Sequence, residues 1–146
     1  MRTEGVFSPD TEADAREAFD TVGPAAQVVV RETARAMEFD REEYSQRVTG
    51  EVVETARDAL FASLLTVHVG EREAFEAWQE EHPEYSVHVN GSDNVDNVVW
   101  HVAPFTEAAV AATFQQEEEA AIGTLRRQAF GRIYADLLKE TPPGNG

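Results

Sequence analysis

Three histidines occupy positions from which they could bind one metal ion together. His68, His88 and His101 each lie in a short segment of alternating residues that is typical of a β-strand. Alternate side chains of a strand share a face, so His68 and His88 point away from the valines on either side of them, and His101 points away from Trp100 and Val102. Neutral imidazole is the commonest protein ligand for transition metals, and three such ligands with an open position form a catalytic zinc centre.

This metal hypothesis requires the three segments to belong to one sheet whose valine-rich side is buried. A divalent transition metal held by His68, His88 and His101 would make the chain a metal-binding protein or a metal-dependent hydrolase. The simpler alternative is that these histidines are ordinary polar residues on a solvated sheet face, and a further one is a single catalytic histidine. A local metal-binding spacing such as His-Glu-x-x-His is missing, so no cofactor is expected from motifs and catalytic residues stay unassigned.

A second candidate site lies in the segment predicted to form the last helix. Gly123 and Gly131 are eight residues apart, with Arg127 midway between them. A glycine inside a helix costs about 1 kcal/mol relative to alanine, so two of them indicate the close approach of another helix. We therefore expect Gly123, Arg127 and Gly131 to mark an interface, such as that of a homo-oligomer. The alternative is that the arginines of this segment pair with neighbouring glutamates.

Other signatures of chemistry are missing from the chain. Glycine-rich phosphate loops and nucleophile-elbow patterns do not occur. Because there is no cysteine, disulfides, thiolate metal ligands and cysteine nucleophiles are excluded. The sequence therefore favours a protein that acts by association, with itself or with a partner, over an enzyme.

The elements that would position these residues change in character along the chain. Residues 8–65 carry the three- and four-residue apolar spacing of helices, with predicted starts at Ser8, Pro24, Asp40 and Thr49. Residues 66–115 alternate like strands around one further helix, with strands predicted at 66–69, 86–90, 98–102 and 109–114. Residues 117–138 return to helical spacing.

These elements predict an α+β fold, in which a helical N-terminal half packs with a small sheet and a long C-terminal helix. Short connections between the last three strands favour a mainly antiparallel sheet of about four strands. Its apolar face needs helices as cover. We expect a single domain over residues 1–140, followed by a flexible tail, residues 141–146, which is rich in proline and glycine.

The charge composition describes the surroundings of the protein more than its chemistry. Eleven arginines and one lysine stand against 28 acidic residues, for a net charge of -16. Such a charge is tolerable where salt screens the self-repulsion, which predicts a halophilic, cytoplasmic protein. An acidic surface is also repelled by anionic lipid and by phosphate, so membrane and nucleic-acid partners are not expected. A transcription regulator is a third alternative, although residues 8–65 carry no basic recognition face.

Four segments together look like those of a known family. They are residues 3–9 (TEGVFSP), 36–44 (AMEFDREEY), 98–105 (VVWHVAPF) and 124–132 (TLRRQAFGR). They resemble a small family of uncharacterised haloarchaeal proteins, a domain of unknown function, over nearly the whole chain. The resemblance implies a saline habitat and a single domain, and it implies no catalytic residue.

Overall fold

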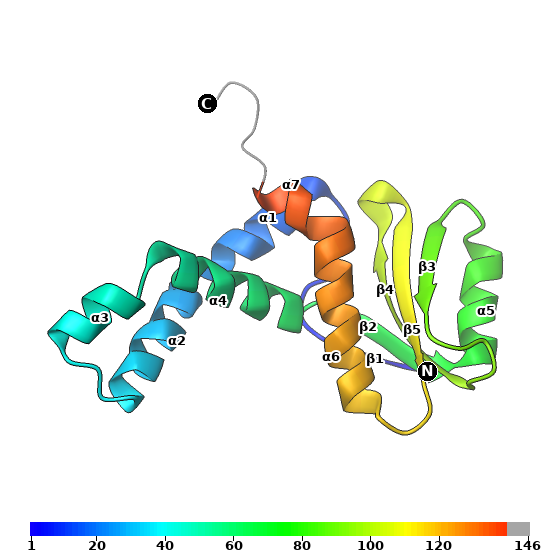
Figure 1. Cartoon of the computed structure of the whole chain (residues 1–146). Helices are drawn as coiled ribbons and strands as arrows, with labels where there is room; N and C mark the ends of the chain where they lie inside the picture. The colour runs from blue at the N-terminus through cyan, green and yellow to red at the C-terminus, as the bar shows by residue number, and fades with distance from the viewer. Residues whose placement is uncertain (140–146) are drawn as a thin grey trace.

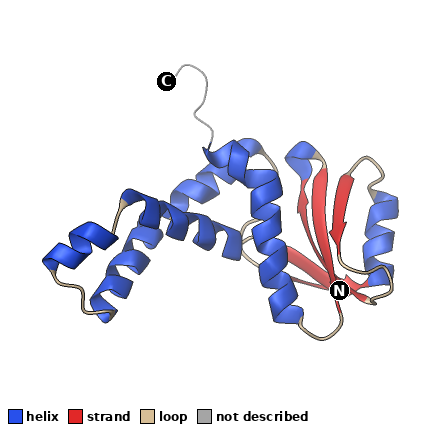
Figure 2. Ribbon diagram, in the orientation of Figure 1, coloured by secondary structure: helices blue, strands red, loops and turns tan. Residues whose placement is uncertain are grey.

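The computed structural model describes residues 1–139, so the tail predicted for residues 141–146 lies outside the described part of the chain. The helical elements are α1 (Glu12–Thr21), α2 (Gly23–Ala36), α3 (Arg41–Arg47), α4 (Gly50–Ser63), α5 (Arg72–Glu81), the 3-10 turn η1 (Pro104–Thr106), α6 (Glu118–Ala129), the π-helical turn η2 (Phe130–Tyr134) and α7 (Ala135–Lys139). The strands are β1 (Arg2–Glu4), β2 (Val67–Glu71), β3 (Ser86–Asn90), β4 (Asn97–Ala103) and β5 (Ala108–Phe114). The predicted α+β class is confirmed (Figures 1 and 2).

The strands form one sheet in the order β1-β2-β4-β5-β3. Its pairings are antiparallel except for that of β3 with β5, which is parallel. The expected antiparallel pairing of β3 is wrong because β5 lies between β3 and β4. The sheet also has five strands rather than about four. The additional strand, β1, is three exposed residues long and therefore gives no apolar alternation in the sequence.

Helices cover both faces of the sheet. The long C-terminal helix α6 packs against one face and the short helix α5 packs against the other (Figures 1 and 2). We call these the α6 face and the α5 face. The main core lies on the α6 face, where the Phe61 ring of α4 contacts the rings of Phe19, Phe130 and Tyr134 at centroid distances of 5.6, 5.9 and 5.3 Å. A smaller core on the α5 face is built around Trp100.

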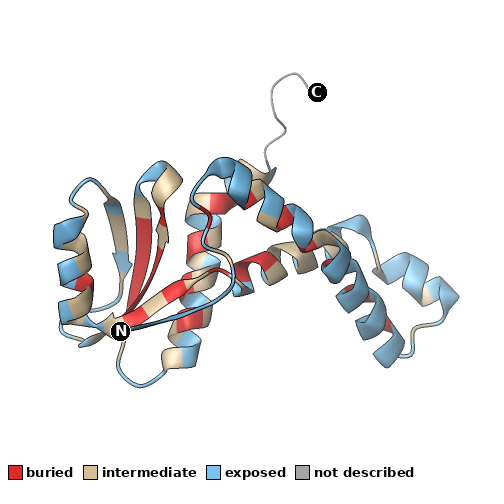
Figure 3. Ribbon diagram, turned by 180° about the vertical axis from the view of Figure 1, so that it is seen from behind, coloured by how far each residue is buried: buried red, intermediate tan, exposed pale blue. Residues whose placement is uncertain are grey.

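Helices α2, α3 and α4 form an arm that extends away from the sheet (Figure 1). Most residues of the arm are exposed, although Ala26, Val30 and Ala34 of α2 are buried, and many of the other buried residues lie in the sheet and in α6 (Figure 3). The predicted caps of the arm are confirmed: Asp40 accepts a hydrogen bond from the Glu43 amide at 2.8 Å and Thr49 accepts one from the Val52 amide at 3.4 Å. None of the helices within residues 1–139 has the length and apolar character needed to cross a membrane.

The last helix is not regular over its whole length. It runs as α6, passes through the π-helical turn η2 and ends as α7. The helix predicted over residues 117–138 is therefore present, and apolar spacing gives no signal of its π-helical turn. A π-helical turn widens the backbone by one residue and moves the side chains that follow it around the helix axis. This turn contains both Gly131 and the fully buried Tyr134.

Candidate interaction surface

The three histidines lie on both faces of the sheet, so the predicted common face is wrong. His68 lies opposite Trp100 in the β2–β4 pairing and its ring stacks on that indole, with the centroids 5.4 Å apart. It therefore belongs to the α5 face. His101 is the next residue after Trp100 in β4 and points to the α6 face, where it forms a hydrogen bond with Tyr134.

His88 shares the α6 face with His101 but does not meet it. Both histidines pair with Val110, from β3 on one side and from β4 on the other, so a whole strand separates them. Two strand spacings amount to roughly 9–10 Å. His88 Nε2 instead donates to Asn90 Oδ1 at 3.2 Å, and Asn90 Nδ2 in turn donates to Gln128 of α6.

The structure therefore does not bring His68, His88 and His101 together. Within residues 1–139, no three histidine, aspartate or glutamate side chains lie close enough to one another to hold a metal ion. Each of the three imidazoles has local partners of its own. The geometry thus favours the alternative in which they serve the fold.

His101 is a buried structural residue with a fixed tautomer. Its side chain is 1% exposed, and its Nδ1 lies 2.6 Å from the carbonyl oxygen of Thr66. A carbonyl can only accept, so Nδ1 carries the proton and Nε2 accepts from the Tyr134 hydroxyl at 2.7 Å. Burial lowers the pKa of His101 to about 4 and raises the pKa of Tyr134. Both groups are therefore neutral at pH 7, and their hydrogen bonds connect β4 to η2 and to Thr66, the residue before β2.

The half-buried His68 also has a lowered pKa, and desolvation against the α5 face is the cause. It sits at one end of a series of aromatic rings that continues through Trp100 and Phe75 to Trp78. This arrangement is a packed aromatic layer between sheet and helix. Strand alternation in the sequence signals His68 and Trp100, and helical spacing signals Phe75 and Trp78, but neither pattern signals their stacking.

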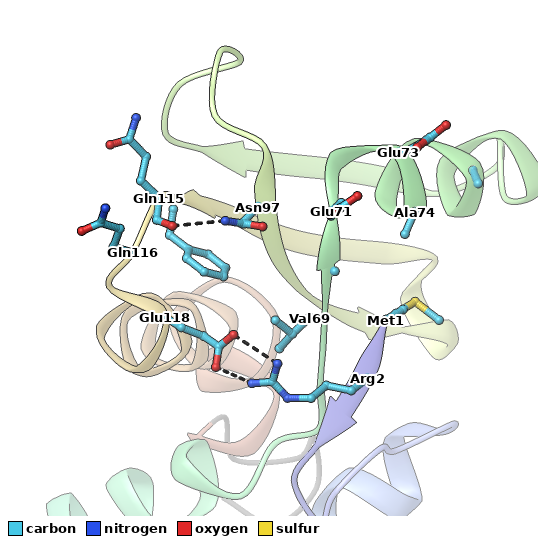
Figure 4. Close-up of a pocket in the computed structure, with 13 residues that line it drawn as sticks. Met1, Arg2, Val69, Glu71, Glu73, Ala74, Asn97, Gln115, Gln116 and Glu118 are labelled. Carbon is cyan, nitrogen blue, oxygen red and sulfur yellow. Dashed lines mark hydrogen bonds and ion pairs between the residues drawn. The ribbon is translucent and has the colours of Figure 1, made fainter.

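An open cleft of 820 Å³ lies where β1, the start of α5 and the start of α6 come together (Figure 4). Arg2 spans it and forms an ion pair with Glu118, while Asn97 donates to the carbonyl oxygen of Gln115 at 3.1 Å. The hydrogen bond from Arg2 lowers the pKa of Glu118, so this carboxylate is ionised and paired. The contacts in this cleft fasten the N-terminal strand to α6.

A more apolar surface lies along the outer face of α4. Of eight large hydrophobic side chains that are exposed in residues 1–139, five belong to the arm: Val28, Val29, Met37, Tyr44 and Val52. Val52 begins the outer face of α4, which continues through the small exposed residues Thr55 and Ala59. We call this face, together with the hollows on its two sides, the α4 surface.

The two hollows of the α4 surface share Thr55 and Ala59, so they form one continuous region. The first hollow, of 430 Å³, lies between α2 and α4 and includes Val29 and Met37. The second, of 460 Å³, lies between α4 and α6, and Phe130 forms part of its wall. Exposed apolar side chains and concave walls of this kind mark interaction sites more often than isolated exposed residues do.

Two of the three predicted interface residues lie in the second hollow. Gly123 and Arg127 both line it, whereas Gly131 lies in η2, outside the hollow, where a methyl group added to it would meet no other atom within 4 Å. Arg127 is exposed, and its single hydrogen bond within the described residues goes to Thr124 Oγ1 at 3.4 Å. The neighbouring Arg126 differs, because it donates to the carbonyl oxygen of Leu65 at 2.9 Å and thereby serves the fold.

Comparison with other proteins gives a family and no activity. Neither a curated protein nor a solved structure matches this chain. Residues 6–135 match a family of unknown function, DUF5809, and the matched region includes the arm, the α4 surface and all three histidines. Because this match covers most of the chain, the protein belongs to the DUF5809 family.

Proposed function

We propose that this protein acts by association, with a second copy of the same chain bound at the α4 surface. The observation that carries the proposal is the exposure of Val29, Met37 and Val52, at 46%, 61% and 42%, around one apolar region. Burying such side chains releases roughly 25 cal/mol for each Å² of apolar surface removed from water. Their clustering on the arm concentrates this gain at one place.

Charge also favours the arm as the place where two copies meet. Residues 23–63 hold five arginines and eight acidic residues, for a net charge of -3, whereas the rest of the chain holds seven basic and 20 acidic residues. Two copies of a chain with a net charge of -16 repel each other, and they repel least where their arms face each other. Concentrated salt weakens the remaining repulsion, because the Debye length falls to about 3 Å at 1 M.

The buried titratable groups are consistent with this proposal. His101 and Tyr134 are neutral and bonded to each other beneath α6, away from the hollows of the α4 surface. In the cleft of Figure 4, Arg2 and Glu118 form an ion pair between β1 and α6. The α4 surface instead gathers three of the exposed large hydrophobic side chains, Val29, Met37 and Val52.

Light scattering in about 1 M KCl tests the proposal on the wild-type chain, on Val52→Glu and on Val89→Glu. Val52 and Val89 are matched in size and exposure, at 42% and 37%, but Val89 lies on the edge strand β3. We expect twice the chain mass for the wild type and for Val89→Glu, and the single-chain mass for Val52→Glu, because a charge buried in an apolar interface is costly. A monomeric wild type, or equal behaviour of the two variants, would contradict the proposal.

A further inference from the structure

Among the charged groups around α4, Arg127 and Glu51 lie towards opposite ends of the helix. Arg127 lines the hollow beside the C-terminal half of α4, together with Ala59 and Ser63. Glu51 is exposed in the first turn of the same helix. Neither side chain takes part in an ion pair with any other residue between 1 and 139.

The separation of these two groups along α4 suits a two-fold arrangement. Glu51 and Ser63 are twelve residues apart, which corresponds to about 18 Å of helix. A two-fold axis perpendicular to α4 sets the helices of two copies antiparallel and exchanges their ends. If this axis passes between Thr55 and Ala59, Ser63 and the nearby Arg127 of one copy face Glu51 of the other.

We infer that the two copies bind as an isologous, antiparallel α4 pair in which Arg127 of each copy forms an ion pair with Glu51 of the other. This inference rests on the proposed self-association and adds its register. In an isologous interface each contact occurs twice, so both charged ends of both copies are matched. Thr55 and Ala59 suit the centre, because small side chains let helices approach closely.

The arrangement also explains a difference between neighbouring arginines. The guanidinium of Arg126 is held by the carbonyl oxygen of Leu65, and its hydrogen bonds stay within one chain. Arg127 lines the same hollow as Arg126, but it is exposed and has no carboxylate partner in the described residues. A carboxylate supplied by a second copy gives this guanidinium the partner that matches its geometry.

Charge reversal tests the register through the dimer dissociation constant, measured by sedimentation equilibrium in about 1 M KCl. The variants are Arg127→Glu, Glu51→Arg, the double variant and an equimolar mixture of the two single variants. Each single variant places like charges opposite each other at two symmetric contacts, so we expect dimerisation to weaken by about tenfold. The double variant and the mixture restore opposite charges and should return to within about threefold of the wild type.

The mixture separates a contact between copies from one within a copy, because only a contact between copies is restored when the two changes lie on different chains. Arg132→Glu, at an exposed site outside the α4 surface, is the matched control and should leave the dissociation constant unchanged. A dimer that Val52→Glu disrupts, but that neither the double variant nor the mixture restores, overturns the register and leaves the proposed function standing. A wild type that stays monomeric overturns both.

Discussion

At the scale of the residue, alternation predicted that the three histidines lie in strands, but it did not predict on which face of the sheet each side chain lies. In β4 the side chains of Val98, Val99, Trp100 and His101 are all buried, because helices cover both sides of the sheet. An alternating pattern then no longer distinguishes a core face from a solvated one. The register, which sets His68 opposite Trp100 and not opposite His101, comes from pairing between distant strands and has no local signal.

The buried His101 should make stability depend on pH. Its pKa is about 4 in the folded chain and about 6.5 when unfolded, so the unfolded state binds more protons between these values. The stabilisation linked to its neutral form is present above pH 6.5 and is lost as pH falls towards 4. The loss should amount to about 3 kcal/mol in denaturant-unfolding free energy measured from pH 7 to pH 4 at constant salt.

The His101→Gln variant isolates this contribution from that of the carboxylates. It should be less stable than the wild type at pH 7, since the Thr66 carbonyl and the Tyr134 hydroxyl lose a well-placed partner. Its stability should fall less steeply below about pH 6.5 than that of the wild type. Equal slopes for the wild type and His101→Gln would show that His101 is not held neutral by the fold.

At the scale of the element, helices with a clear apolar period and a capping residue were predictable. Asp40 and Thr49 begin α3 and α4 as their residue types indicate. The start of α1 was not predictable from the sequence. Ser8 and Thr11 are both good capping residues, and Ser8 is followed by proline, which suits the first helical position. The structure begins α1 after Thr11, whose hydroxyl accepts from the Asp14 amide at 3.0 Å.

This choice of cap can be tested by a matched pair of substitutions. Thr11→Ala removes the hydrogen bond to the Asp14 amide and should lower the free energy of unfolding by about 1 kcal/mol. Ser8→Ala, at the exposed alternative position, should change it by less than about 0.5 kcal/mol. Chemical denaturation of both variants gives the comparison, and a larger loss for Ser8→Ala would place the helix start where the sequence alone suggested it.

At the scale of the whole molecule, one sheet with helices on both faces holds an arm that contributes little to the main core beyond Phe61. Apolar spacing predicted the α+β class, whereas the interface expected at Gly123, Arg127 and Gly131 stays a prediction. The hollows were not predictable, because they arise where α2, α4 and α6 come together from distant parts of the sequence. The halophilic habitat suggested by the charge remains a prediction.

The central claim is that two copies meet along α4, and crosslinking through a single introduced thiol tests it most directly. The chain has no cysteine, so Ala59→Cys and its matched control Ala77→Cys, on the exposed side of α5, each carry one reactive group. With a short bis-maleimide reagent in about 1 M KCl, Ala59→Cys should yield a covalent dimer, because helices in contact lie about 8–10 Å apart. Ala77→Cys should remain a single chain. Crosslinking of Ala59→Cys that is no faster than that of Ala77→Cys would contradict the account.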